Sequence, residues 1–321
     1  MTHAVPTPGP SAPLPCASLS AGRVVVFGSL NVDLTVRVER FPEPGETLTG
    51  SELGIAPGGK SSNQAVAMAI LGSAARLIGA VGDDDNATFL LDRARAAGVD
   101  VSGVARDPSH ATGSAMIVVD VTGENTIIIS PGANGALTPA SVRTEDFAEA
   151  SVVCLCLEVP VPAVQAAAEQ GRRAGAQVLL NLSPYRDVPN ELLSLTDVLL
   201  VNRTEAALVL GVREVGDDWS AALGGFLGLG IDRAVVTLGA EGSVVLDATA
   251  ERGDLVTLID PVRVEAIDST GCGDAYTGAI AHRLASGSPL ASAARFAAQA
   301  SALAATAEGA QSSYRAFAAL R

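Results

Sequence analysis

The 321-residue chain contains few aromatic, histidine, cysteine and basic residues. Aromatic residues make up 3% of it, although 48% of its residues are hydrophobic, so its core must be built mainly from Ala, Val and Leu. Small aliphatic side chains of this kind suit buried parallel strands covered by helices. At this length we expect one large domain with an appendage. The composition therefore favours an α/β enzyme.

Positive charge is scarce: 21 Lys and Arg stand against 35 Asp and Glu, which gives a formal net charge of -14. Proteins that bind nucleic acids draw most of their affinity from basic side chains that neutralise phosphates. We therefore expect no nucleic-acid partner. Any phosphate ligand must be held by local backbone amides, a few basic side chains and metal ions.

The four cysteines, Cys16, Cys154, Cys156 and Cys272, form no CxxC pair, and the chain has only three histidines. This argues against a zinc site. Cys154 and Cys156 alternate within an apolar segment, as neighbours on one face of a buried strand do. Because nothing indicates a disulfide framework, a reducing cytoplasm is the expected location.

Residues 1–20 hold five prolines and have neither the basic start nor the apolar stretch of a signal peptide. We expect residues 1–20 to be a disordered tail and residues 21–321 to form the folded domain. No stretch approaches the run of about 18 apolar residues that a membrane span requires. Membrane insertion is therefore not expected.

From residue 23 onward, short β-branched strands alternate with segments of helical periodicity, which predicts βαβ units and a mainly parallel sheet. Two polar hairpins at about 34–55 and 111–131 interrupt this order, and we expect them to form a small separate sheet acting as a lid. The other expected elements are strands at 23–28, 75–80, 151–157, 177–181, 197–201 and 233–238, helices at 61–72, 86–97, 161–174, 204–210, 217–228, 274–286 and 289–307, and a hairpin near 242–266.

The most informative motif is the run from Asp268 to Asp274, in which Gly271, Cys272 and Gly273 open a helix. Small residues before a helix let backbone amides converge, and with the helix dipole they form an anion hole that suits a transferring phosphoryl group. Asp274 at the first turn could accept the proton of a hydroxyl that attacks the γ-phosphate of ATP. It could equally cap the helix. The run alone leaves both roles open.

Three other motifs carry weaker signals. The run above lacks the third glycine of a dinucleotide-binding fingerprint, because Tyr276 stands there. Gly54–Ser61 matches the phosphate-loop pattern GxxxxGK[ST], but the segment before it resembles a polar hairpin arm, and Pro57 lacks an amide that would hold phosphate. The acidic residues 83–85 are typical of a solvated helix N-terminus rather than of a metal site.

Eight sequence blocks between about Val24 and Ser313 resemble, in order, those of the PfkB-type carbohydrate kinases. The resemblance implies a three-layer α/β/α domain with a mainly parallel central sheet and a small β-sheet lid that often pairs with a second copy in a homodimer. The blocks are Gly28-Ser29-Leu30-Asn31-Val32-Asp33, Gly58-Gly59-Lys60-Ser61-Ser62-Asn63-Gln64, Gly132-Ala133-Asn134, Leu157-Glu158, Asn202-Arg203-Thr204-Glu205, Thr237-Leu238-Gly239, Asp268 to Asp274, and Gly309-Ala310-Gln311.

The same resemblance implies the site residues, with Asp274 as the general base and the amides of Gly271, Cys272 and Gly273 as the anion hole. The sugar would be contacted by Asn31, Asp33, Gly59, Lys60, Asn63, Glu158 and Asp274. ATP would be bound by Asn202, Glu205, Thr237, Gly239 and Gly273, with Mg²⁺ held through water near Asn202 and Glu205. A monovalent cation, usually K⁺, would lie at Asp268, Thr270, Ala304, Gly309 and Ser313.

The implied reaction is ATP-dependent phosphorylation of D-ribose to D-ribose 5-phosphate. Deoxyribose, another pentose or hexose, and a nucleoside are alternative acceptors, and a sugar sensor without catalysis is a remote alternative. The chain has Ser61-Ser62 where the family commonly has Gly-Ala, and Ser269 and Cys272 where it commonly has Thr and Ala. All four remain small, but the two serines near the sugar keep the choice of acceptor open.

Overall fold

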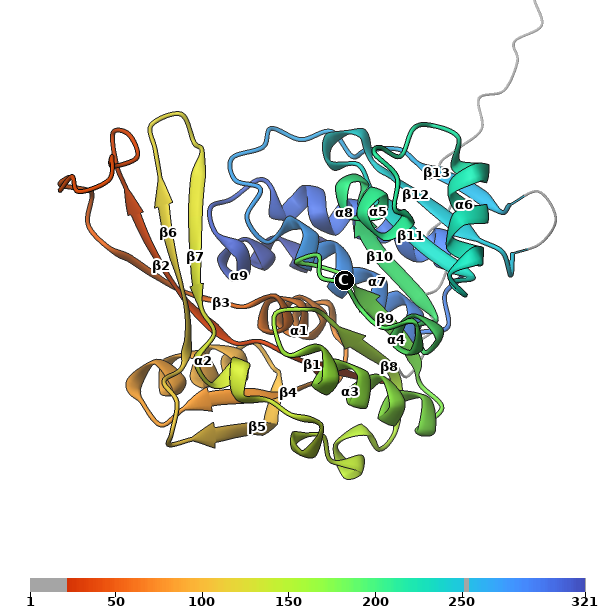
Figure 1. Cartoon of the computed structure of the whole chain (residues 1–321), viewed down its shortest axis with the longest axis horizontal. Helices are drawn as coiled ribbons and strands as arrows, with labels where there is room; N and C mark the ends of the chain where they lie inside the picture. The colour runs from red at the N-terminus through yellow and green to blue at the C-terminus, as the bar shows by residue number, and fades with distance from the viewer. Residues whose placement is uncertain (1–21, 251–253, 321) are drawn as a thin grey trace, which may run out of the picture.

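Nine strands form the main sheet, in the order β13-β12-β11-β10-β9-β8-β1-β4-β5 (Figure 1). The computed structural model describes residues 22–250 and 254–320, so the tail expected at 1–20 lies outside the described residues. All pairings from β11 to β5 are parallel, and only β12 and β13 pair in the antiparallel sense. The mainly parallel sheet is thus confirmed. The strands are β1 (Arg23–Phe27), β4 (Ala75–Gly82), β5 (Asp100–Asp107), β8 (Ala150–Leu155), β9 (Gln177–Asn181), β10 (Val198–Asn202), β11 (Arg233–Thr237), β12 (Ser243–Asp247) and β13 (Val256–Ile259).

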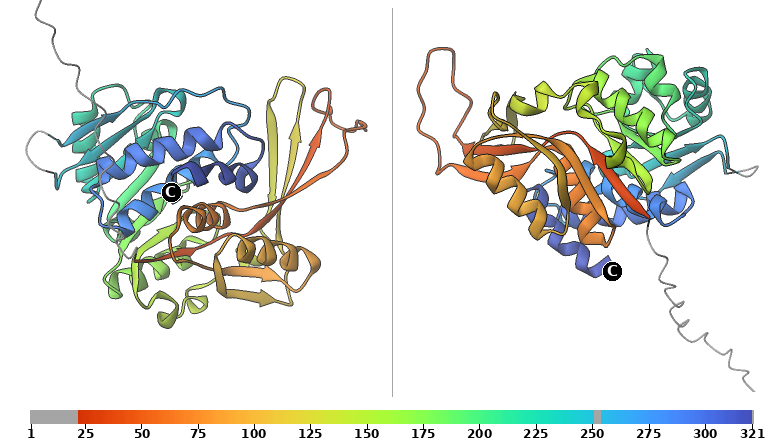
Figure 2. Two further views of the ribbon diagram at one scale, coloured as in Figure 1. Left: turned by 180° about the vertical axis from the view of Figure 1, so that it is seen from behind. Right: turned by 90° about the horizontal axis from the view of Figure 1, so that it is seen from below.

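Helices cover both faces of this sheet, as successive side chains of β1 show. Val24 and Val26 belong to the core formed with α1 (Lys60–Leu71), α2 (Asp85–Ala96), α7 (Cys272–Ala285) and α8 (Leu290–Ala304). Val25 and Phe27 belong to the core on the opposite face, with α3 (Val161–Arg173), α4 (Asn190–Ser194), α5 (Arg203–Leu210) and α6 (Trp219–Gly228). Alternation along a strand buried on both faces requires this arrangement. The predicted three layers are confirmed (Figure 2). No helix in the described ranges is long and apolar enough to cross a membrane.

A second sheet, in the order β3-β2-β6-β7, stands beside the main sheet, at the left of Figure 1. It comprises β2 (Asn31–Arg37), β3 (Gly54–Gly58), β6 (Gly113–Val119) and β7 (Asn125–Ser130). The hairpin of β6 and β7 matches its prediction closely. In the first hairpin the strands lie at the two ends of the expected range, and residues 38–53 contain no strand. Pro42 and Pro44 have no N–H to donate to a ladder, which accounts for this difference.

The edge strand β5 has no counterpart among the predicted elements. Its residues are largely polar, and Asp100, Ser102 and Gly103 are poor strand formers. It forms a strand because β4 offers a free edge beside it. Its extended structure is therefore stabilised by hydrogen bonds with β4, and not by the strand propensity of its own residues.

The strand order contains one switch point, between β1 and β8. From β1 the chain moves outward to β4 and β5, then returns at β8 and proceeds through β9, β10 and β11 on the other side. In open parallel sheets, ligands bind beyond the carboxyl ends of the strands at such a switch. Asn31 and Asp33 follow β1, and Glu158 follows β8. The topology therefore brings predicted sugar-contacting residues from distant segments to one edge.

Candidate active site

Asp274 lies in the first turn of α7 with 6% of its surface exposed. Its two carboxylate oxygens each accept a hydrogen bond from a side-chain amide on α1: Oδ2 from Asn63 Nδ2 at 2.9 Å and Oδ1 from Gln64 Nε2 at 3.1 Å. The N-cap of α7 is Gly271, and the Asp274 carboxylate reaches across to α1 instead of binding its own helix. Burial raises the pKa of Asp274, while the charge of Lys60 and the two amides oppose that rise.

Two further carboxylates share the space in front of Asp274. Glu158 Oε2 accepts hydrogen bonds from Ser29 Oγ at 2.6 Å and from the Lys60 N–H at 3.0 Å. Burial, reinforced by the charges of Glu158 and Asp274, raises the pKa of Asp33 to about 7. Burial acts to lower the pKa of Lys60, but the charges of Asp274 and Glu158 outweigh it and raise that pKa. Lys60 therefore stays an ammonium beside Asp274 and Glu158.

The raised pKa of Asp33 has a consequence for stability. An unfolded aspartate titrates at about 3.9, so between pH 4 and pH 7 the folded chain binds more protons than the unfolded chain. This group therefore makes the free energy of unfolding fall as the pH rises through that window. Asp33→Asn removes this pH dependence. Without sugar, the offset, which is the melting temperature of the variant minus that of the parent protein, should therefore be at least about 2 °C higher at pH 8 than at pH 5. Scanning calorimetry at both pH values tests this, and equal offsets would contradict it.

The segment before α1 contacts the start of β2 through a glycine. Gly59 has a φ of 87°, and a Cβ there would lie 2.8 Å from the Asn31 nitrogen and 2.9 Å from the Leu30 Cα. Both the left-handed conformation and the backbone contact require glycine. β3, which precedes Gly59, pairs with β2 in the small sheet. It is not a buried parallel strand, so the structure does not provide the context of a phosphate loop.

The predicted anion hole lies at the N-terminus of α7. Gly271 has a φ of 76°, and its carbonyl accepts a hydrogen bond from Tyr314 Oη at 2.9 Å. The Cys272 N–H already donates to the Ser269 carbonyl at 3.2 Å. A Cβ built at Gly273 would meet nothing within 4 Å, so the helix entrance is open at that residue. The first-turn amides of a helix have no carbonyl partner in the helix itself, which leaves this end suited to an anion.

The predicted nucleotide residues follow the neighbouring strands β10 and β11. Asn202 and Thr237 are register partners at the ends of these strands, and Gly239 comes two residues later. Asn202 Oδ1 accepts from the Glu205 N–H and Glu205 Oε2 accepts from the Asn202 N–H, both at 2.8 Å. This reciprocal capping box uses one oxygen of each side chain to start α5.

Two of the predicted cation residues, Thr270 and Gly309, contact Asp268. Its Oδ1 accepts from the Thr270 N–H and its Oδ2 from the Gly309 N–H, both at 2.8 Å. Burial acts to raise the pKa of Asp268, but these hydrogen bonds outweigh it and lower that pKa. Ala304 ends α8, next to Ala305, whose carbonyl accepts the Asp268 N–H at 3.3 Å. Ser313 lies in the short helix α9 (Ala310–Ser313).

Four polar residues contact the site but are absent from the predicted set: Ser29, Gln64, Asn134 and Gln311. Asn134, for example, donates to Asn31 Oδ1 at 2.9 Å and fixes that amide. All four lie inside the sequence blocks that carried the family resemblance. The blocks could therefore have pointed to them, but only the fold shows which way their side chains face.

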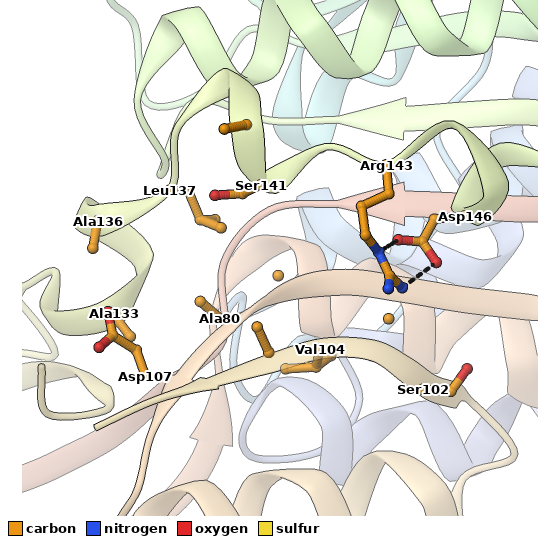
Figure 3. A pocket seen from close by; sticks show the side chains of 14 residues that line it. Ala80, Ser102, Val104, Asp107, Ala133, Ala136, Leu137, Ser141, Arg143 and Asp146 are labelled. Atoms are coloured by element: carbon orange, nitrogen blue, oxygen red, sulfur yellow. Dashed lines mark hydrogen bonds and ion pairs between the residues drawn. The ribbon is translucent and has the colours of Figure 1, made fainter. Parts of the chain in front are cut away.

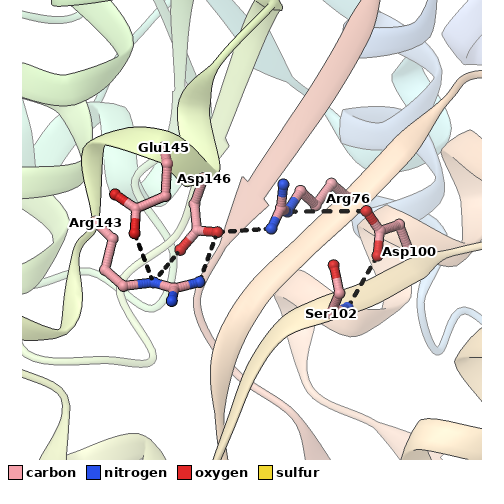
Figure 4. A network of polar contacts seen from close by, with 6 residues as sticks. All are labelled: Arg76, Asp100, Ser102, Arg143, Glu145 and Asp146. Atoms are coloured by element: carbon pink, nitrogen blue, oxygen red, sulfur yellow. Dashed lines mark hydrogen bonds and ion pairs between the residues drawn. The ribbon is translucent and has the colours of Figure 1, made fainter.

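A cavity of about 370 Å³ lies elsewhere, between β4–β5 and the 3-10 segments at 132–147 (Figure 3). None of its lining residues belongs to the predicted site. The buried Asp146 at its border bonds to Arg76 Nη2 at 2.6 Å and Arg143 Nε at 2.9 Å (Figure 4). Because two guanidinium groups neutralise this carboxylate, it anchors the segment to β4.

A buried carboxylate beside an open, glycine-led helix N-terminus has the parts that a kinase acting on small hydroxyl compounds needs, a proton acceptor next to a phosphoryl-binding site. The chain belongs to the pfkB family of carbohydrate kinases, whose family model matches residues 21–316.

Several relatives are similar along nearly their whole length. A ribokinase from Staphylococcus aureus is 38% identical, covering 91% of this chain and 96% of that protein. A deoxyribokinase from Salmonella typhimurium is 32% identical, covering 91% and 95%. The solved structure of Arabidopsis thaliana ribokinase complexed with ribose and ATP superimposes with a TM-score of 0.85 at 30% identity, covering 94% of this chain and 98% of that one.

Proposed function

We propose that this protein transfers the γ-phosphoryl group of ATP to the 5-hydroxyl of D-ribose, giving D-ribose 5-phosphate and ADP. The observation that carries the proposal is Asp274, a buried carboxylate bonded by two amides beside the open start of α7. The similarity to ribokinases, one of them solved with ribose and ATP, supports ribose as the acceptor. The deoxyribokinase relative supports deoxyribose as the main alternative.

The charges at the site favour a neutral polyol as the acceptor. Glu158 and Asp274 lie beside one ammonium, that of Lys60, and Asp33 lies near both of these carboxylates. A sugar hydroxyl can donate to a carboxylate and accept from an amide or ammonium, whereas a phosphorylated acceptor would be repelled. In this proposal Asn31, Asp33, Gly59, Lys60, Asn63 and Glu158 bind and orient the sugar.

Asp274 acts as the general base: it accepts the proton of the attacking hydroxyl as the new bond to phosphorus forms and the bond to ADP breaks. Backbone amides at Gly271 and Gly273 bind the charged phosphoryl oxygens. The Cys272 amide contributes less, because it already serves the Ser269 carbonyl. Asn202, Glu205, Thr237 and Gly239 hold the nucleotide in this proposal.

Mg²⁺ would accompany ATP and neutralise charge on the phosphates. The capping box at Asn202 and Glu205 fits contact through water, because one oxygen of each side chain is already used and Mg²⁺ keeps part of its water shell. A potassium ion is proposed at Asp268, Thr270, Ala304, Gly309 and Ser313. The donors there are a carboxylate, carbonyls and a hydroxyl, which suit a hard cation.

The small sheet is proposed as a lid and as the contact between two copies in a homodimer. One of its faces carries Ile55, Met116 and Ile128, whose side chains are 49% to 60% exposed. Leu34 pairs with Ile55 and with Met116, and Met116 pairs with Ile128, so all lie on the same face. An exposed apolar face of this kind fits a protein contact.

We further propose that residues 21–321 form one kinase domain working in the cytoplasm, where the free thiols of Cys154, Cys156 and Cys272 would stay reduced.

A panel of acceptors assayed for ADP release tests the proposed reaction. We expect ribose to give the highest kcat/KM, and deoxyribose, which lacks one hydroxyl, to lose about tenfold or more because a polar group in the site is left unpaired. Running the panel in potassium and in tetramethylammonium buffers tests the cation at the same time. Another sugar exceeding ribose by hundreds of times in kcat/KM would overturn the ribose assignment.

A further inference from the structure

The two amides that bind Asp274 are themselves held from behind. Asn63 donates to Asp274 through Nδ2, and its Oδ1 accepts a hydrogen bond from Gln311 Nε2 at 3.0 Å. Gln64 donates through Nε2, and its Oε1 accepts from Cys154 Sγ at 3.2 Å. On each side, a donor behind the amide binds its oxygen while its NH₂ group faces the carboxylate.

Orientation matters here because an amide has one donor end and one acceptor end of nearly the same shape. An ionised carboxylate can only accept hydrogen bonds, so Asn63 must present its NH₂ to Asp274. If the amide turned over, its oxygen would face a carboxylate oxygen, and two buried acceptors would repel each other. A donor at the far end of Asn63 prevents that turn, and Gln311 supplies it.

Gln311 is itself fixed from two sides. Its Nε2 also donates to Ser62 Oγ at 3.1 Å, so the NH₂ end is engaged with two acceptors on α1. Its backbone lies in α9, two residues after Gly309, whose N–H is bound by Asp268. The glutamine therefore connects the C-terminal segment to the carboxylate through a single intervening side chain.

We propose that Gln311 is a positioning residue for phosphoryl transfer: by donating to Asn63 Oδ1 it keeps the Asn63 amide turned so that its NH₂ binds Asp274. Gln311 acts through Asn63 and does not touch the reacting atoms. The inference rests on the proposed role of Asp274 as the base. Losing the correct orientation should lower kcat and raise the pH at which activity is lost on acidification, because the ionised form of Asp274 loses a donor.

The pH dependence of Asp274 also responds to its other neighbours, which do not change in the proposed variants. Lys60 favours the ionised carboxylate, and Glu158 disfavours it. The remaining titratable groups coupled to Asp274 are Asp33, Cys154, Cys272 and Tyr314. A replacement at position 311 that removes the donor without adding a charge isolates the Asn63 contact, because a new carboxylate there would itself disfavour the ionised form of Asp274.

The test compares Gln311→Glu with Gln311→Leu in the full-length protein. Glutamate has the shape of glutamine but presents oxygens to Asn63 Oδ1, so it should turn the amide over. We expect Gln311→Glu to lower kcat by about tenfold at neutral pH, to change the ribose KM by less than about threefold, and to move the acidic limb of the kcat profile upward. Gln311→Leu, which removes the donor without adding a charge, should lose less activity but should still move the acidic limb upward. Gln165→Glu, the same change on α3, serves as the control and should leave all three readouts unchanged.

A role in packing alone would give the opposite order, with the isosteric glutamate close to the parent protein and leucine impaired. That order, or an unmoved acidic limb in Gln311→Leu, would overturn the inference. Melting temperatures of both variants check that the fold is kept. Asp274→Asn, assayed beside them, separates the two claims: if it keeps full activity the proposed function fails, and if it alone is inactive only the role of Gln311 fails.

Discussion

Replacing Asp274 by asparagine should lower kcat by about a hundredfold or more and change the sugar KM only a few-fold. Asparagine has nearly the same size and its oxygen can keep one of the two hydrogen bonds from α1, but it cannot accept the proton of the attacking hydroxyl. The two histidines in the described residues, His110 and His282, bind Asp107 and Ser73 instead of this region, so no imidazole is placed to replace it. Steady-state ADP release at saturating ATP gives both constants.

Asp218→Asn is the matched control for this change. Asp218 caps α6, accepting from the Ala221 N–H at 3.0 Å, and asparagine serves as an N-cap equally well. Its activity should equal that of the parent protein. If Asp274→Asn also matched the parent, Asp274 would not be the base. If neither the parent nor the variants released ADP with any acceptor, a sugar sensor on a kinase fold would be the better account.

Lys60→Ala should raise the sugar KM by about tenfold or more while the dissociation constant for ATP stays within about threefold. The reason is its position: Lys60 follows the last strand residues of β3, and its charge lies near Asp274 and Glu158, which are both predicted sugar-contacting residues. Titration calorimetry with a non-hydrolysable ATP analogue measures the second quantity separately. Loss of ATP binding with sugar binding intact would instead favour a phosphate loop at Gly54–Ser61.

A second experiment uses the fact that Lys60 is the only lysine in the chain. An amine-directed reagent therefore has one side-chain target besides the terminal amine. Sugar should protect Lys60 from labelling, and ATP alone should not. The reverse pattern of protection would place Lys60 at the nucleotide.

The parts of the fold that could be predicted from sequence are those whose pattern reflects their own environment. Apolar β-branched runs such as that of β1 are buried on both faces, and β6 and β7 are β-branched segments that pair on either side of a clear turn. β5 could not be predicted in this way, because a polar edge strand owes its structure to hydrogen bonds offered by β4. The range 34–55 locates the first hairpin but not its strands, because the sequence marks a turn and does not show where pairing begins.

The same distinction applies to the site. Asp274 could be singled out because glycines and a carboxylate before a helical segment carry a chemical meaning on their own. Gln311 could not, because its importance depends on a contact with Asn63, 248 residues away in sequence. The spacing of Asn202 and Glu205 is that of a capping box and could have indicated that they bond to each other, a contact that restricts how they can serve a metal.

The most direct test of the account is a crystal structure with ribose and a non-hydrolysable ATP analogue bound. We predict that the 5-hydroxyl oxygen lies about 3 Å from a carboxylate oxygen of Asp274 and faces the γ-phosphate, which lies against the start of α7 at Gly273. A nucleotide bound instead along Gly54–Ser61, or a sugar whose 5-hydroxyl faces away from Asp274, would contradict it.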